Sequence, residues 1–203
     1  ARRIAAGERV RKFDVVIGAA TRDIEPGEHV HGHNLALVDE YRDPGFCEDV
    51  RPVAFVPEAE RAQFMGYRRE DGRVGTRNFI GLLSSVNCSA TVIHRIAAHF
   101  TPERLADYPN VDGVVAFAQT SGCGMSSPSE HFDLLRRTIA GYARHANLAG
   151  ALIVGLGCER NQVADLLASQ GLTEGPRLRS LVMQDSGGTR ATIAAGIEAV
   201  QAM

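Results

Sequence analysis

Three of the four cysteines share one sequence context that could do chemistry. Cys88 ends the apolar run FIGLLSSVNC, Cys123 lies between two glycines in SGCGM, and Cys158 ends the apolar run ALIVGLGC. The three positions follow one another at equal intervals along the chain. Thiolates are soft ligands that select iron–sulfur clusters, zinc or copper over magnesium and calcium. The pattern therefore indicates a set of thiols that could bind one metal ion or cluster.

The glycines beside these cysteines have a predicted role of their own. Gly122 and Gly124 flank Cys123, and Gly157 precedes Cys158. Glycine permits tight turns and leaves backbone N–H groups uncovered beside the sulfur, where an anionic substrate could bind. Cysteine is also a small apolar residue that fills crowded turns, and this alternative stays open at each single position.

The elements that must position the thiols are predicted from hydrophobic periodicity. We expect strands at about 79–86, 112–118, 150–156 and 180–184, and helices at about 90–100, 128–144, 161–170 and 188–202. Four β-α units in series predict an α/β fold, in which helices flank a parallel sheet of Rossmann-like repeats. The ligand crevice of such a sheet lies outside the carboxyl ends of its strands, so the thiols would face it.

Two helix starts carry capping signals. Ser127, Pro128 and Glu130 resemble a capping box with proline at the first helical position. Ser186 or Thr189 is expected to cap the last helix.

The first 65 residues have a different pattern. Residues 1–37 contain short β-like runs between turn signals, which predicts a small all-β piece. Residues 38–65 lose this periodicity, and Pro44, Pro52 and Pro57 stand among charges, which predicts an extended linker. The third part of the predicted division is the α/β domain, residues 66–203.

Histidines and arginines form two further constellations. His29, His31 and His33 are spaced by two, so on a strand they would share one face and suit a transition metal or an anionic substrate. An exposed, solvated face is the alternative. Arg73 and Arg77 precede the first α/β strand and could clamp a carboxylate. The neighbouring Arg68 and Arg69 are expected to belong to a solvated loop.

Composition excludes several classes of protein. The 203 residues are 44% hydrophobic and 23% charged, with a net charge of −2 and no basic stripe, so nucleic acid is not an expected partner. No apolar stretch reaches the ~20 residues of a membrane span, and the first residues show no signal peptide. We therefore expect a cytoplasmic protein without a membrane partner, in which free, metal-binding or catalytic cysteines are more common than disulfides.

Seven motifs in order, GEHVHGHN, DGRVGTRN, SVNCSATV, YPNVDGVV, SGCGM, VGLGCERNQ and QDSGGT, resemble the altronate and galactarate dehydratase family, which includes sulfolactate sulfo-lyase. The resemblance covers almost the whole chain. It implies a β-rich domain of the antifreeze-like kind before a catalytic region. It also implies that the first segment of the β-domain and the C-terminal half of the family's chain lie outside these residues.

The resemblance further implies a hydro-lyase that dehydrates a hexonic or hexaric acid to a 2-keto-3-deoxy acid, with iron as Fe²⁺ or an iron–sulfur cluster and Mn²⁺ as an alternative. The run from His29 to Asn34 favours altronate over galactarate. Cys88, Cys123 and Cys158 are then the predicted metal ligands. The predicted substrate contacts are His31, His33, Asn34, Gly122 and Gly124.

The mechanism expected from this reaction needs a strong electrophile, because abstracting the α-proton puts a second negative charge on a carboxylate. A metal helped by Arg73 or Arg77 would stabilise it, and Glu159, Asp185 or a histidine would be the base. Two other classes stay open: a non-catalytic module that binds a small acid, and a thiol redox protein, which the absence of C-x-x-C disfavours. A homo-oligomer is compatible with all three.

Overall fold

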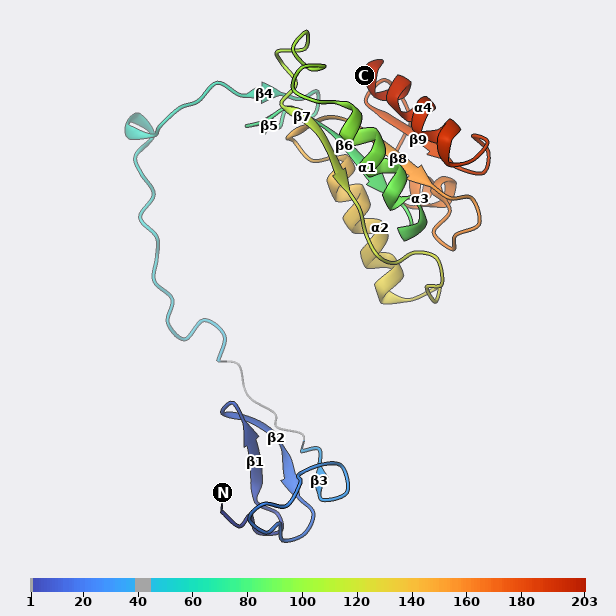
Figure 1. Ribbon diagram of the computed structural model, residues 1–203. Coiled ribbons are helices and arrows are strands. Elements are labelled where there is room, and N and C mark those ends of the chain that lie inside the picture. The colour runs from blue at the N-terminus through green and yellow to red at the C-terminus, as the bar shows by residue number, and fades with distance from the viewer. Residues whose placement is uncertain (1, 39–44) are drawn as a thin grey trace. The chain divides into compact units, whose positions relative to one another are not determined.

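The computed structural model describes residues 2–38 and 45–203, which form two compact units, Ala1–Arg61 and Ala62–Met203 (Figure 1). The start of the predicted linker, including Pro44, lies outside the described residues. In the described stretch between residue 45 and residue 66, one 3-10 turn forms, η1 (Glu58–Glu60).

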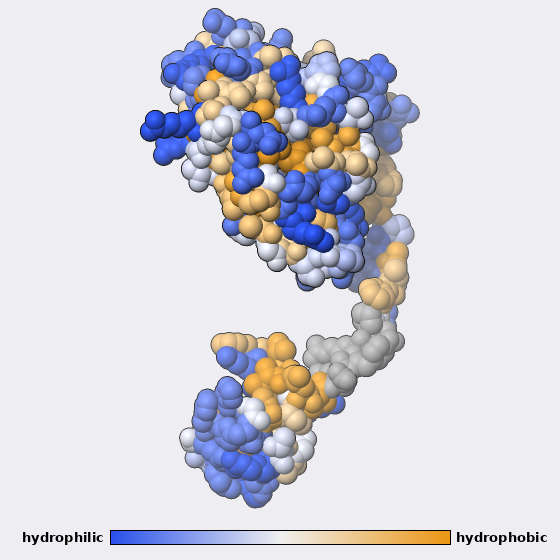
Figure 2. All heavy atoms as spheres, turned by 90° about the vertical axis from the view of Figure 1, so that its right-hand side faces the viewer, coloured by the Kyte–Doolittle hydropathy of each residue, from blue (hydrophilic) through white to orange (hydrophobic). Residues whose placement is uncertain are grey.

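The small unit is an antiparallel sheet with the strand order β1-β2-β3, which confirms the predicted β-rich piece. Its strands are β1 (Arg9–Lys12), β2 (Val15–Ala20) and β3 (Leu35–Ala36). Phe13 and Asp14 join β1 to β2 with φ angles of 51° and 63°, the left-handed pair that a two-residue hairpin turn requires. Val10, Ala20 and Ile24 form its core. Figure 2 shows apolar surface left exposed on this unit.

The large unit is built on a sheet of four parallel strands in the order β7-β6-β8-β9, which confirms the predicted fold class. A short antiparallel hairpin, β4 (Tyr67–Arg68) and β5 (Val74–Gly75), precedes it. The sheet consists of β6 (Phe79–Ser84), β7 (Gly113–Phe117), β8 (Leu148–Gly155) and β9 (Leu178–Val182). The helices are α1 (Ala90–His99), α2 (Glu130–Ala143), α3 (Val163–Ser169) and α4 (Thr189–Gln201), with the 3-10 turn η2 (Asn87–Ser89) before α1.

Helices cover both faces of this sheet (Figure 1). Leu152 and Val154 of β8 pack in one cluster with residues of α1 and α4. Ala151 and Ile153, which alternate with them, pack in a second cluster with residues of α2 and α3. Because β8 is buried on both faces, its sequence is a continuous apolar run, as central parallel strands require.

Both predicted helix caps are wrong. The N-cap of α2 is Ser129, whose hydroxyl accepts from the Phe132 N–H at 3.2 Å, so Pro128 lies before the helix. The N-cap of α4 is Gly188, with a φ of 92° and no side-chain cap. Gly188 itself occupies the N-cap position, in a backbone conformation with positive φ that favours glycine. Ser186 lies two residues before this position, and Thr189 is already the first residue of the helix.

In the described residues, none of the helices has the length and apolar character needed to span a lipid bilayer.

The two-faced core generates a direct stability prediction. Leu152 is 0% exposed, and Leu152→Ala should lower the free energy of unfolding by about 3 kcal/mol, because it removes apolar contacts and leaves a cavity. Leu134→Ala, at a position that is 51% exposed on α2, should change it by less than about 0.5 kcal/mol. Urea denaturation followed by far-UV circular dichroism measures both. Equal effects would contradict the core described above.

Candidate active site

The carboxyl ends of three neighbouring strands carry the equally spaced cysteines. Cys88 lies in η2 directly after β6, Cys123 in the loop after β7, and Cys158 in the loop after β8. The strand order β7-β6-β8 places these three loops side by side at one edge, with about 5 Å between adjacent strands. The chain leaves β6 toward one neighbour and later returns to its other neighbour, so the point between β6 and β8 is the topological switch point where ligands of such sheets bind.

All three thiols are exposed, so none is the buried apolar cysteine of the alternative interpretation. The Cys88 thiol donates a weak hydrogen bond to Asn87 Oδ1 at 3.6 Å. Across residues 2–38 and 45–203, no three histidine, cysteine, aspartate or glutamate side chains are placed so that they could hold a metal ion. The thiols at this edge are suitable ligands for a soft metal ion. That Cys88, Cys123 and Cys158 converge on one point stays a prediction.

Beneath the thiols, buried polar side chains tie the loops to the sheet. Asn161 donates its side-chain amide to the Ser85 carbonyl at 3.1 Å, which joins the β8 loop to the β6 loop. The Asn87 N–H donates to the Ser121 carbonyl at 2.9 Å, which joins the β6 loop to the β7 loop. The residues of this buried layer, 0–2% exposed, are Ser84, Ser85, Ser89, Glu159 and Asn161.

Glu159, a predicted catalytic base, has a structural place in this layer. One carboxylate oxygen accepts from the Ser85 hydroxyl at 2.9 Å and the Leu156 N–H at 3.1 Å, and the other accepts from the Gly157 N–H at 2.5 Å. A Cβ at Gly155 would lie 2.5 Å from this carboxylate, so glycine leaves the room it needs. The carboxylate is 2% exposed and accepts three hydrogen bonds, so this structure does not leave Glu159 open to a substrate as a catalytic base would be.

The two glycines around Cys123 differ. Gly122 is buried with a φ of 99°, and a Cβ there would lie 2.8 Å from the Ser85 carbonyl oxygen. Gly122 therefore allows close packing of two loops, whereas Gly124 faces open space. Next to them the side-chain oxygen of Gln119 accepts from the Ser121 N–H at 2.6 Å. Its amide nitrogen is buried without a hydrogen-bond partner in the described part of the chain.

Asp185 lies at the same edge, in the exposed turn after β9. The preceding Gln184 donates its backbone N–H to the Leu156 carbonyl at 3.0 Å, so this turn adjoins the loop that carries Cys158. Of the two predicted carboxylate bases, Asp185 is the one that the structure leaves open to a substrate.

Arg73 and Arg77 lie at the other edge of the sheet. Arg77 precedes β6. Its backbone N–H donates at 3.3 Å to Oδ1 of Asn147, the residue just before β8. A strand of six residues separates this edge from the thiols, roughly 17 Å at the usual rise per residue. Arg73 pairs with Asp71 at 2.6 Å. The expectation that the two arginines act beside the cysteines is wrong, because they lie at the amino end of β6 and the cysteines lie at the carboxyl ends of the strands.

The three histidines of the small unit do not lie on a strand, contrary to expectation. Their loop is shaped by Asn34, which is 0% exposed. Its amide nitrogen donates to the His29 carbonyl at 3.0 Å and its oxygen accepts from the His31 N–H at 2.9 Å. The rings still gather, with centroids 5.4 Å apart for His29 and His31 and 6.3 Å for His29 and His33. Asn34, predicted to contact substrate, instead holds the histidine loop.

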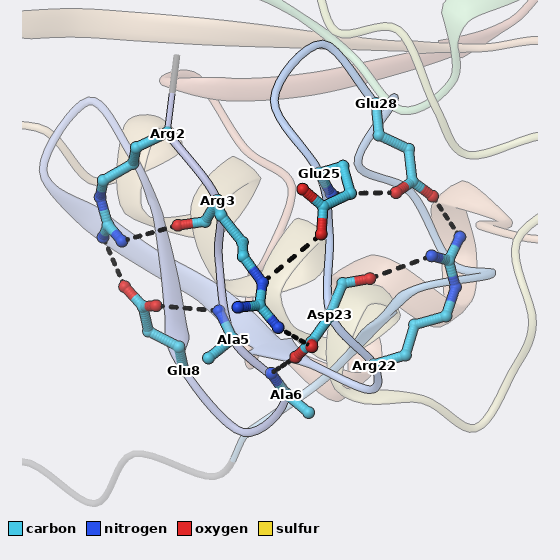
Figure 3. A network of polar contacts seen from close by, with 9 residues as sticks. All are labelled: Arg2, Arg3, Ala5, Ala6, Glu8, Arg22, Asp23, Glu25 and Glu28. Carbon is cyan, nitrogen blue, oxygen red and sulfur yellow. Dashed lines mark hydrogen bonds and ion pairs between the residues drawn. The ribbon is translucent and has the colours of Figure 1, made fainter.

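Figure 3 shows a network of ion pairs and hydrogen bonds that includes Glu28, the residue before the histidine loop. Glu28 pairs with Arg22, and Glu28 Oε1 also lies 3.5 Å from the Asn34 amide nitrogen. The Arg22 hydrogen bond, followed by one from the Glu25 N–H, lowers the pKa of Glu28. Asp23 accepts from the backbone of Ala6 and from an arginine, and both hydrogen bonds lower its pKa.

Comparisons with known proteins place the chain in a family. Residues 66–203 match the family described as D-galactarate dehydratase/Altronate hydrolase, second domain, and residues 1–38 match the altronate/galactarate dehydratase SAF domain. The chain belongs to the altronate/galactarate dehydratase family.

Three curated members of this dehydratase family align with the chain. It is 34% identical to altronate dehydratase of Escherichia coli strain K12 over 96% of this chain and 38% of that protein. It is 28% identical to altronate dehydratase of Bacillus subtilis strain 168, over 79% of this chain and 32% of that protein. It is 32% identical to the L-threo-forming galactarate dehydratase of Escherichia coli strain K12, over 81% of this chain and 32% of that protein. The chain thus spans between about a third and two fifths of these relatives.

The sequence did not point to the residues that join the loops at the carboxyl edge of the large sheet. Ser85 and Asn161 hold the loops together, yet neither has a charge or a soft ligand atom such as a thiolate that would attract notice. The available signal was position: Ser85 directly follows a strand, and Asn161 follows a predicted base by two residues.

Glu159 carries the first prediction from the site. Glu159→Ala should lower the free energy of unfolding of the large unit by about 3 kcal/mol, because buried donors lose their acceptor. Glu198→Ala, at an exposed position on α4, should change it by less than about 0.5 kcal/mol. Urea denaturation compares the two variants. If Glu159→Ala unfolds like Glu198→Ala, the carboxylate does not hold the edge.

The network of the small unit predicts acid sensitivity. The pKa values of Glu8, Asp23 and Glu28 are lowered by arginine and backbone hydrogen bonds. These lowered pKa values stabilise the folded unit at pH values above the unfolded carboxyl pKa values of about 4, and that stability is lost as the pH falls through the lowered folded pKa values. Amide NMR signals of the small unit should lose dispersion in that window. Glu28→Gln should weaken the dependence, and Glu58→Gln, outside the network, should leave it unchanged.

Proposed function

We propose that the polypeptide carrying this chain dehydrates a sugar acid, altronate or a related hexonate or hexarate, to a 2-keto-3-deoxy acid. The observation that carries this proposal is the gathering of three exposed cysteine loops at the switch point of a unit that matches this dehydratase family. The chain covers 38% of the Escherichia coli altronate dehydratase. The activity is therefore proposed for the whole polypeptide, to which this edge contributes.

The edge suits an anionic substrate. The helices α1 and α4 both begin there, and neither has a side-chain cap or an acidic residue in its first turn. Their first N–H groups and their dipoles favour a carboxylate. Gly124 faces open space beside Cys123, so a substrate can approach the backbone at this position.

The proposed reaction removes the proton from the carbon next to the carboxylate and hydroxide from the following carbon. The products are water and an enol, which becomes the 2-keto-3-deoxy acid. Asp185 is the proposed base, because it is exposed at the edge, whereas Glu159 is buried. The helix N–H groups would stabilise the charge that develops on the carboxylate. His31 and His33 stay proposed substrate contacts, because both are exposed on the histidine loop.

The thiols give this proposal its cofactor. Iron as Fe²⁺ or an iron–sulfur cluster, or Mn²⁺ in its place, would supply a Lewis acid for the departing hydroxyl group. Cys88, Cys123 and Cys158 are the proposed ligands, because their soft sulfur atoms are exposed on adjacent loops. Binding would require the three loops to close on one point.

The test compares two cysteine variants of the full-length polypeptide, purified anaerobically with iron. Cys123→Ser should lose most bound iron and most altronate dehydration while its circular dichroism is unchanged, because it removes one thiolate ligand. Cys47→Ser removes an exposed thiol that lies outside the edge and should keep both.

Two outcomes would contradict separate parts of the proposal. Unchanged iron content in Cys123→Ser would exclude the thiol ligands. Iron-loaded protein that dehydrates neither altronate nor galactarate would exclude the proposed substrates, and dehydration of galactarate alone would shift the assignment to that branch.

A further inference from the structure

A second site lies at the amino edge of the large sheet, away from the cysteines. A cavity of about 340 Å³ opens between the hairpin β4–β5, the end of α2 and the segment before β9. Its basic residues include Arg69, Arg144, His145 and Arg177. We call this cavity the arginine pocket. It has no part in the proposed dehydration, because the length of the strands separates it from the thiols.

Backbone carbonyl groups hold two of these guanidinium groups in place. Arg69 donates from Nε to the Ala146 carbonyl at 2.7 Å and from a terminal nitrogen to Asn78 Oδ1 at 2.8 Å. Arg177 donates from Nε to the Ala149 carbonyl at 2.8 Å. A guanidinium fixed through some of its N–H groups keeps the others in a defined direction, which preorganises it for a ligand.

Arg144 completes the set from the end of α2. One terminal nitrogen donates to the carbonyl groups of Gln170 and Gly171, the latter at 3.2 Å. These residues follow α3, so the contact joins the α2 and α3 sides of the pocket. Its guanidinium is exposed on the surface.

Three of the arginines that line the pocket lack a close ion pair with a carboxylate of the described residues. In the described part of the chain, Arg69, Arg144 and Arg177 form no ion pair within 4.0 Å. Two carboxylates line the pocket, but Asp71 pairs with Arg73 at 2.6 Å and Glu70 pairs with none of the three. Partial burial, followed by the charge of Arg177, lowers the pKa of Arg69. Asp71 attracts Arg69 and Arg177 at longer range, but arginines outnumber carboxylates in the lining, so the pocket favours an anion.

We infer that the arginine pocket binds a small anion with carboxylate or phosphate groups. Arginine presents a planar fork of N–H groups that matches both kinds of oxyanion. The volume lies near the lower end of the range for small-molecule pockets, about 300–1,000 Å³, so a compact metabolite fits better than a folded partner. The carbonyl contacts explain how the guanidiniums are held. They do not explain why three guanidinium groups that lack a close ion pair in the described residues line one cavity.

Calorimetric titration of the 203-residue chain tests this site with two probes, inorganic phosphate and galactarate, at low ionic strength. At least one should bind, and the uncharged polyol galactitol should not. Arg177→Gln should weaken binding at least about tenfold, because it removes charge-assisted hydrogen bonds. Arg95→Gln makes the same charge change at an exposed position on α1, across the sheet, and should stay within about twofold.

Binding of phosphate alone or galactarate alone supports the site and identifies its chemistry. If Arg177→Gln loses its circular dichroism signal, Arg144→Gln, at an exposed position, carries the same expectation. Binding of neither anion, or equal affinities in Arg177→Gln, Arg144→Gln and Arg95→Gln, overturns the inference. Cys123→Ser should leave this binding unchanged, so failure of the thiol proposal remains distinguishable from failure of this inference.

Discussion

The parallel pairing of β6 with β8 is the interaction on which the rest of the large unit depends. These strands are consecutive in the sheet but not in the chain, because α1, β7 and α2 come between them. Their backbone hydrogen bonds create the switch point, and the buried carboxylate of Glu159 joins their loops above it. If this pairing failed, the cysteine loops and the two helix N-termini would no longer share an edge.

The two edges of the sheet differ in chemistry as a consequence of strand direction. All four strands run the same way, so thiols, loop glycines and helix N-termini gather at the carboxyl edge. Guanidinium groups gather at the amino edge, where carbonyl groups at the strand starts and helix ends accept their hydrogen bonds. Anions could therefore bind at both edges for different reasons: backbone dipoles at one and side-chain charge at the other.

The small unit illustrates how a short polar side chain replaces regular structure. The histidine spacing suggested a strand, and the rings do gather, but Asn34 shapes the loop instead. An asparagine can donate and accept at once, so one buried side chain satisfies both ends of the loop. The ion pairs around it are exposed and therefore depend on pH and salt.

The sequence by itself determined the elements and the order in which they occur. Apolar runs and periodicity specify strands and helices locally, so the four β-α units and the positions of Cys88, Cys123 and Cys158 after strands were predictable. Tertiary structure alone decided which strands are neighbours, that Glu159 is buried, and that Arg73 lies at the far edge from the thiols. The reason is that strand order, burial and the grouping of arginines around Arg177 depend on contacts between residues far apart in the chain, which local pattern does not encode.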